Sequence, residues 1–219
     1  MTNAPAESDA EIVEDVLRGN VNAFERLMRR YNALVFRTAR GVVRNDASAE
    51  DCAQRAWISA FDHLTQLGRQ DGFAPWIARI AYREAIRSAR KAKLRAIRAF
   101  GNEVGERGVA YAVTPELEAQ RSELRAQLEA SIDELPDTLR EVFVLCEVQS
   151  LSTRETGDIL GISEENVRIR RHRARQALSV RITHEIRPEV AFFFDGERCN
   201  RMVAVTLRAL QARCVVVPK

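Results

Sequence analysis

The sequence is informative first for what it lacks. It contains no run of about 18 apolar residues, the length that a membrane-spanning helix requires. Its first residues, MTNAPAESDAEIVED, are acidic and polar, unlike the basic and then apolar stretch of a signal peptide. We therefore expect a cytoplasmic protein with no membrane insertion.

Residues that commonly carry catalysis are also scarce. The chain has three His and four Cys among its 219 residues, with no CxxC pair and no His at metal-ligand spacing. A Ser/His/Asp order and a glycine-rich phosphate loop are missing as well. The sequence thus predicts no enzyme, with no catalytic residue, no metal site and no cofactor. The four cysteines are expected to be small buried side chains in a reducing compartment, with a thiol sensor as the alternative for the last two; they are Cys52, Cys146, Cys199 and Cys214.

The stretch LSTRETGDILGISEENVRIRRHRARQAL, residues 151–178, has the pattern of a helix-turn-helix. Ser152 and Glu155 form a capping-box pattern, which starts a helix. Gly161 stands where the chain must turn, and Ser163 is a good N-cap for the next helix. These spacings predict two short helices joined by a tight turn.

The second of these helices is strongly basic. From residue 168 to residue 181 there are six Arg, one His and no acidic residue. The face expected to be buried carries Val167, Ala174 and Leu178. A separate face carries Arg168, His172 and Arg175. An ordinary solvated face is the alternative, but such faces usually mix both signs of charge, so the pattern favours contact with DNA.

A second basic segment lies earlier in the chain. The net charge is only +3, yet residues 69–98 hold nine Lys or Arg against two acidic residues. Helical spacing there predicts a basic ridge formed by Arg79, Arg83, Arg87, Arg90 and Lys91. Such a ridge can follow a phosphate backbone, and Phe73 at its start is either a stacking platform for unpaired bases or a core residue. Two basic segments in one chain are typical of a protein that binds nucleic acid at two places.

Helical periodicity runs through most of the chain and predicts an all-α fold. The pattern fails across residues 97–115, which are glycine-containing and mixed in charge. We expect two small helical domains, residues 1–96 and 116–184, joined by that stretch as a flexible linker. Residues 185–219 form a C-terminal extension with an amphipathic helix, expected to dock on the second domain or, alternatively, to make an independent regulatory contact.

Taken together, these segments resemble the extracytoplasmic-function (ECF) sigma factors of the sigma-70 family, which are initiation subunits of bacterial RNA polymerase. The stretch LPDTLREVFVLCEVQSLSTRETGDILGISEENVRIRRHRARQAL is similar to the family's helix-turn-helix domain. The stretch AFERLMRRYNALVFRTARGVVRNDASAEDCAQRAWISAF is similar to its core-binding region, and FAPWIARIAYREAIRSARK to its promoter-melting helix. The resemblance covers roughly residues 10–95 and 116–182.

The resemblance implies an alternative sigma factor that binds RNA polymerase core, recognises and melts promoter DNA, and has an anti-sigma factor as a further partner. The residues that it implies for docking on the polymerase are Asp46, Glu50, Asp51, Gln54 and Trp57. The residues that it implies for base contacts in the minus-thirty-five element are Arg168, Ile169, His172 and Arg173, with Arg170 and Arg175 placed for phosphates.

For the minus-ten element, the resemblance implies that the loop at residues 68–72 and Phe73 capture a base flipped out of the duplex. Arg69 and Asp71 belong to this loop, and the basic ridge would hold the adjoining backbone. One residue departs from the family pattern, because Arg171 stands where an apolar side chain usually completes the buried stripe. Its stem must extend outward, or the helix must be rotated.

The competing hypothesis is a helix-turn-helix transcriptional regulator that acts on duplex DNA without being a polymerase subunit. Such a regulator would lack the basic ridge and the aromatic loop of the N-terminal half.

Overall fold

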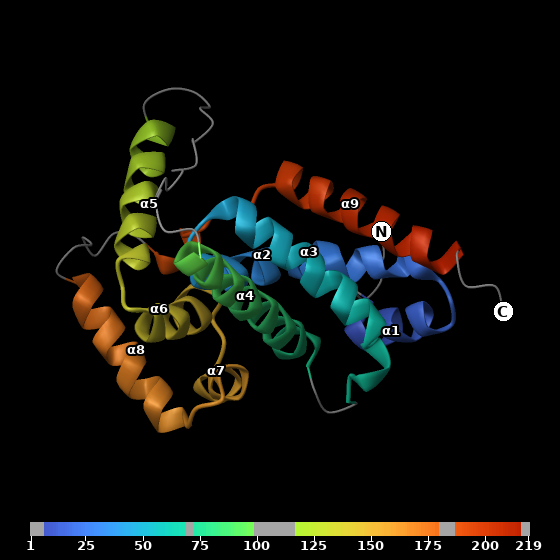
Figure 1. The fold of residues 1–219 in the computed structure, drawn as a ribbon, viewed down its shortest axis with the longest axis horizontal. Coiled ribbons are helices and arrows are strands. Elements are labelled where there is room, and N and C mark those ends of the chain that lie inside the picture. The colour runs from blue at the N-terminus through green and yellow to red at the C-terminus, as the bar shows by residue number, and fades with distance from the viewer. Residues whose placement is uncertain (1–6, 69–71, 99–116, 180–186, 216–219) are drawn as a thin grey trace, which may run out of the picture.

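A computed structural model describes residues 7–68, 72–98, 117–179 and 187–215. Within these ranges the regular elements are helical (Figure 1), which confirms the prediction of an all-α fold. None of the helices described there is both long and apolar enough to cross a lipid bilayer.

The N-terminal half is a unit of four helices. They are α1 (Asp9–Leu17), α2 (Phe24–Val43), α3 (Asp46–Asp62) and α4 (Phe73–Arg98), with 3₁₀ turns at Val21–Ala23 and Leu64–Gln66. Local chemistry sets the boundaries: a capping box at Ser8 opens α1, and the Asn45 side chain accepts a hydrogen bond from the Ser48 N–H at 2.8 Å to open α3. The apolar faces meet in a core that includes Phe24, Leu27, Trp57 and Ile77, all fully buried.

The C-terminal half contains α5 (Leu117–Asp133), α6 (Asp137–Phe143), α7 (Thr153–Leu160) and α8 (Glu164–Ser179). A single π-helical turn, Val144–Val148, continues α6. This half has buried residues of its own, including Leu128, Ile132, Val142 and Val167. Of the predicted linker, the first two residues continue α4, and the remaining residues, 99–115, lie outside the described ranges.

The two halves pack against each other through α2, α4, α6 and α7. Arg140 of α6 is 1% exposed and donates from Nε to the Gly41 carbonyl of α2 at 2.6 Å. The backbones come close at this point, since a Cβ atom at Gly41 would lie 3.0 Å from the Val144 side chain. Nearby, Arg40 of α2 forms a bidentate ion pair with Asp133 of α5 at 2.7 and 2.8 Å. The contact between the halves is therefore built on buried arginines as well as apolar side chains.

The C-terminal extension ends in α9 (Gly196–Val215), which lies along α2 and α3 (Figure 1). Its apolar stripe agrees with the sequence pattern, because Val203 and Leu210 are buried. The expected docking partner was wrong: α9 packs on the N-terminal half and not on the helix-turn-helix domain. An apolar stripe predicts that a helix packs, but it does not specify the surface.

Candidate functional site

The helix-turn-helix is formed by α7 and α8, with the predicted start and turn. The Ser152 N–H donates to the Glu155 carboxylate at 2.8 Å, and the Glu155 N–H donates to the Ser152 hydroxyl at 3.2 Å. Gly161 ends α7 in the left-handed region at φ 70°. Gly157, which the sequence reasoning passed over, allows the turn to close, since a Cβ there would lie 2.7 Å from the Ile162 carbonyl oxygen.

Helix α8 has the two faces that the sequence predicts. Its buried stripe is Val167, Ala174 and Leu178, which are at most 3% exposed. Arg168, Ile169, His172 and Arg173 are exposed, Ile169 to 43%, and Arg170 is half-buried. The side chains that the sequence assigns to base contacts therefore share an accessible surface, and an apolar side chain sits among the basic ones.

Glu147, at the end of the π-helical turn, binds two arginines of α8. Arg175 donates to its carboxylate at 2.8 and 2.9 Å, and Arg171 forms a further ion pair with it. Burial alone would raise the pKa of Glu147, but the hydrogen bonds from Arg175 and Arg171 outweigh burial and hold that pKa below its usual range. Arg171, the departure from the family pattern, is accommodated by this ion pair.

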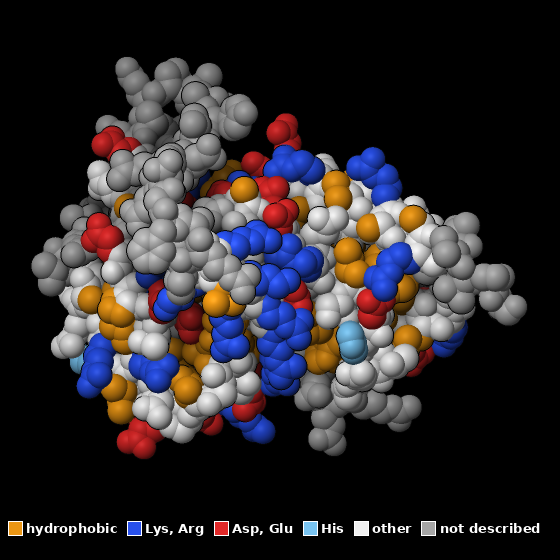
Figure 2. Space-filling model, in the orientation of Figure 1, with side chains coloured by type: hydrophobic (Ala, Val, Ile, Leu, Met, Phe, Trp, Pro, Cys, Tyr) orange, Lys and Arg blue, Asp and Glu red, His pale blue; other side chains and the backbone are white. Residues whose placement is uncertain are grey.

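The basic ridge follows the exposed side of α4. Arg83, Arg87, Arg90 and Lys91 are exposed, and Arg79 is half-buried. Figure 2 shows the resulting band of Lys and Arg side chains on this face of the molecule. Between α3 and α4 lies a groove of about 480 Å³, with basic side chains from Arg55, Arg87, Lys91 and Arg95 and carboxylates from Asp51 and Glu84. A groove lined mainly by Lys and Arg suits a polyanion. The carboxylate of Glu84 pairs with Arg55 and Arg87 and so orients their guanidinium groups.

Phe73 is a core residue and not an exposed platform. It is 3% exposed, and its ring centroid lies 5.2 Å from that of Tyr31 and 5.5 Å from that of Trp76. The expectation that Phe73 itself stacks on a base therefore does not fit its position, because the ring would have to leave the core. Its two predicted partners in the loop, Arg69 and Asp71, lie outside the described residues.

The residues predicted to dock on the polymerase do not share one surface. Asp46 and Glu50 point toward α9, and Asp51 lines the groove beside α4. Gln54 is half-buried. Trp57 is 0% exposed and packs edge-on against Phe24 at 5.5 Å. Trp57 is thus part of the core that supports α3. The sequence motif around Trp57 is largely polar, and it did not indicate whether this side chain faces the core or the solvent.

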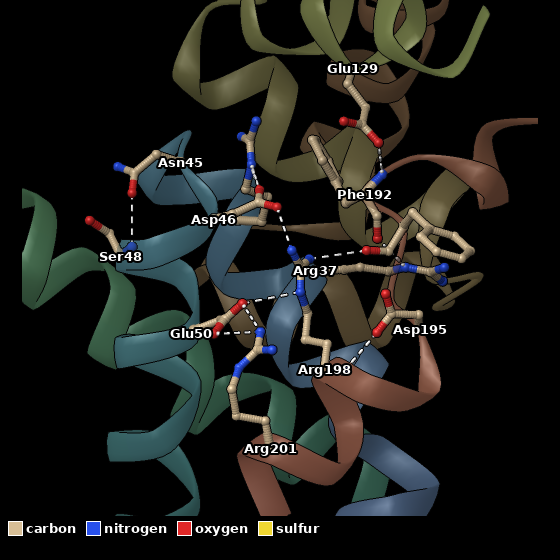
Figure 3. Close-up of polar contacts among 12 residues, drawn as sticks. Arg37, Asn45, Asp46, Ser48, Glu50, Glu129, Phe192, Asp195, Arg198 and Arg201 are labelled. Atoms are coloured by element: carbon tan, nitrogen blue, oxygen red, sulfur yellow. Dashed lines mark hydrogen bonds and ion pairs between the residues drawn. The ribbon is translucent and has the colours of Figure 1, made fainter. Parts of the chain in front are cut away.

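Asp46 and Glu50, which we call the acidic pair, are bound by arginines that sequence reasoning did not single out (Figure 3). Arg198 of α9 lies 2.8 Å from the Asp46 carboxylate and 3.1 Å from that of Glu50. Arg201, one turn further along α9, lies 3.1 Å from Glu50. The available signal was the placement of Arg198 and Arg201 one turn apart at the start of a helix that also carries an apolar stripe.

Of the four cysteines, Cys52 and Cys146 are buried as predicted, and burial raises the pKa of both thiols. Cys199 of α9 is half-buried and accepts a hydrogen bond from the Asn32 amide at 3.3 Å. The side chain of Cys214 lies outside the described residues.

The fold and these surfaces define a class of all-α protein with two helical modules in one chain, one of them a helix-turn-helix and each with an exposed basic helix face. Comparison with known families gives the same two modules: the family described as sigma-70 region 2 matches residues 27–114, and sigma-70 region 4 matches residues 125–178.

Among similar proteins is the ECF RNA polymerase sigma factor SigW of Bacillus subtilis, 31% identical over 172 residues, which covers 76% of this chain and 92% of that protein. The RNA polymerase sigma-H factor of Pseudomonas aeruginosa is 29% identical over 178 residues, covering 78% of this chain and 92% of its own length. Among solved structures, the sigma factor RpoE in complex with the anti-sigma factor NepR from Bartonella quintana has a TM-score of 0.60 at 16% identity, covering 78% of this chain and 99% of that one.

The chain belongs to the ECF RNA polymerase sigma factors of the sigma-70 family. It is accordingly an alternative sigma factor, which directs transcription initiation, and sigma factors are regulatory subunits and not enzymes. The match to region 2 decides against the competing hypothesis of a regulator that acts without polymerase.

Proposed function

We propose that α8 reads the minus-thirty-five element of the promoter in the major groove. Arg168, Ile169, His172 and Arg173 would contact base edges, because they share the exposed face of a helix whose opposite face is buried. Arg170 and Arg175 would contact phosphates. Arg175 is held by Glu147, which fixes the position of its guanidinium but also neutralises part of its charge.

The second part of the proposal concerns the minus-ten element. The exposed ridge of α4, with Arg83, Arg87, Arg90 and Lys91, would hold the backbone of the opened strand, with Arg79 at its start. The loop with Arg69 and Asp71 would hold the flipped base, and Phe73 would support that loop from within the core. The observation that carries the whole proposal is the presence of two exposed basic helix faces, on α4 and α8, in separate halves of one chain.

The third part is docking on RNA polymerase core through α3, with contacts on two sides of the helix: Asp46 and Glu50 on the side of α9, and Asp51 on the side of α4. Gln54, which is half-buried, would add a contact, and Trp57 would support the helix from within the core. Carboxylates on one helix suit a basic partner surface. We also infer a cytoplasmic location, where the polymerase is, and an anti-sigma partner, in line with the RpoE and NepR complex.

The decisive experiment is transcription in vitro with purified core polymerase and a genomic promoter pool, followed by mapping of the products. The full chain should bind core and start transcription at promoters that share upstream and downstream elements. Failure to bind core or to open any promoter would contradict the proposal.

Arg173→Ala tests the base contact. We expect the substitution to weaken binding of the minus-thirty-five element by about 1–3 kcal/mol and to relax sequence preference there, as loss of a bidentate contact does. Arg18→Ala is the matched control, because Arg18 is an exposed arginine at the end of α1 that pairs with Glu14 of its own helix. Equal transcription by the two variants would remove Arg173 from the set of base-contacting residues.

A further inference from the structure

Helix α9 occupies the part of α3 that the proposed function assigns to the polymerase. Arg198 and Arg201 bind the acidic pair, Asp46 and Glu50, at 2.8–3.1 Å (Figure 3). The acidic pair attracts a basic partner surface, and α9 supplies one within the same chain. Arg40 of α2 also donates to Asp46, at 2.9 Å, so this carboxylate already serves two arginines. Because α9 lies along the side of α3 that carries Asp46 and Glu50, another basic helix cannot lie there at the same time.

The contact between α9 and the N-terminal half includes buried polar atoms without a hydrogen-bond partner in the part of the chain that the structure describes, as do Thr38 and Trp57 elsewhere in the interior. Asn32 of α2 is fully buried, yet its side-chain oxygen has no hydrogen-bond partner among the described residues. Thr206 of α9 is fully buried as well, and its hydroxyl has none there either. Buried polar atoms are nearly always paired in permanent interiors. The unpaired atoms of Asn32 and Thr206 reduce the stability that this contact gains from its apolar side chains.

A short segment before α9 connects it to both halves. The Phe192 N–H donates to Glu129 of α5 at 2.7 Å, and the Phe192 carbonyl accepts from Arg37 of α2 at 3.2 Å (Figure 3). The Phe194 ring packs on Phe36 of α2 at 5.4 Å. This anchor keeps α9 near α3 even when the helix itself is released, so that rebinding is an intramolecular step.

We propose that α9 is an intramolecular cover over the acidic pair, and that RNA polymerase core must displace it in order to bind. The inference rests on the proposed role of α3 in core binding and adds a regulatory step to it. The cover restrains the sigma factor without a second protein, and a change in α9 that removes the ion pairs of Arg198 and Arg201 favours the core-binding state.

The test compares two substitutions on the same helix in the full chain. Arg201→Glu places a carboxylate against Glu50, whereas the control Arg208→Glu makes the same charge change two turns away, at an exposed side chain that bonds the Ala204 carbonyl of its own helix. Affinity for core polymerase is measured by fluorescence anisotropy. A cover that is closed nine-tenths of the time lowers the apparent affinity about tenfold. We therefore expect Arg201→Glu to bind core several-fold more tightly than Arg208→Glu, and Arg198→Glu/Arg201→Glu to approach the full tenfold.

Hydrogen exchange of the α9 amides is measured on the same proteins to show whether the cover opens. Faster exchange in α9 together with tighter core binding supports the proposal. Release of α9 with unchanged or weaker core binding overturns it while leaving the core-binding role of the chain intact, and so does unchanged exchange in the double variant. If no variant binds core although α9 is released, the failure lies in the proposed function itself.

Discussion

Glu147 determines how the recognition helix α8 is held on the rest of its domain. Its carboxylate pairs with Arg171 and Arg175. The Glu147 side chain is 11% exposed, but those of Arg171 and Arg175 are 35% and 57% exposed, so water partly screens the pairs. Glu147→Gln leaves two guanidinium groups without their counter-charge. We expect the free energy of unfolding at neutral pH to fall by about 1 kcal/mol, less than is usual for hydrogen bonds to charged groups because both arginines are partly exposed. Urea unfolding measures it, and Glu164→Gln, which affects the exposed pair with Arg168, is the control.

The same residue gives a pH dependence with a defined sign. The pKa of Glu147 is lower in the folded protein than its ordinary value, so the folded state binds fewer protons than the unfolded state. The stabilisation is therefore complete above the unfolded pKa, about 4.5, and is lost as the pH falls through the folded value. We expect wild type and Glu147→Gln to differ most in stability near neutral pH and to converge in acid. A constant difference down to the acid limit would contradict the assignment.

At the scale of elements, the turn between α7 and α8 depends on one missing side chain. In Gly157→Ala the new Cβ would meet the Ile162 carbonyl oxygen at 2.7 Å, and a backbone atom cannot simply rotate away. We expect a loss of about 1–3 kcal/mol, as for other overpacking substitutions, together with weaker binding to duplex DNA. Gly196→Ala is the matched control, since a Cβ there meets nothing within 4 Å. Unfolding and duplex-binding titrations that do not distinguish the two variants would show that the turn can open without cost.

The helices and the helix-turn-helix could be predicted from sequence because both are local. Periodicity predicted an all-α fold, and the residues around Ser152, Gly161 and Ser163 set the caps and the turn. The orientation of aromatics was harder to predict: Phe73 and Trp57 lie in motifs of mixed polarity, and only the packing of four helices buries them. The position of α9 was not predictable from its apolar stripe, because a stripe does not specify which apolar surface it packs on. That surface is selected in part by ion pairs with Asp46 and Glu50, which lie far earlier in the sequence.

At the scale of the whole molecule, Arg140 joins the two halves. It is buried and donates to the Gly41 carbonyl of α2 and to the Leu135 carbonyl and Asp137 carboxylate of its own half. Arg140→Met leaves buried carbonyl groups without donors, which costs about 1–3 kcal/mol. We expect calorimetry to show a lower midpoint and a broadened transition, or a transition split in two, as the halves lose their coupling.

The control for that experiment is Arg44→Met. Arg44 reaches the same Asp137 carboxylate from α2, but its side chain is 47% exposed. Its replacement should leave the transition single and nearly unmoved. If both variants unfold like wild type, the buried arginine does not couple the halves.

The position of α9 also has a consequence for the order of folding. Glu50 and Arg201 are separated by 151 positions, whereas α1 to α4 are joined by short connections and contact one another directly. Helices and nearby pairs form within microseconds, but a contact across so long a loop must wait until the intervening chain has compacted. Each newly folding molecule therefore passes through a stage in which α3 is structured and Asp46 is paired with Arg40 of α2, while Glu50 has not yet met Arg198 and Arg201. During that interval the Glu50 carboxylate of a nascent chain is open to a basic partner surface, because α9 has not yet packed against α3.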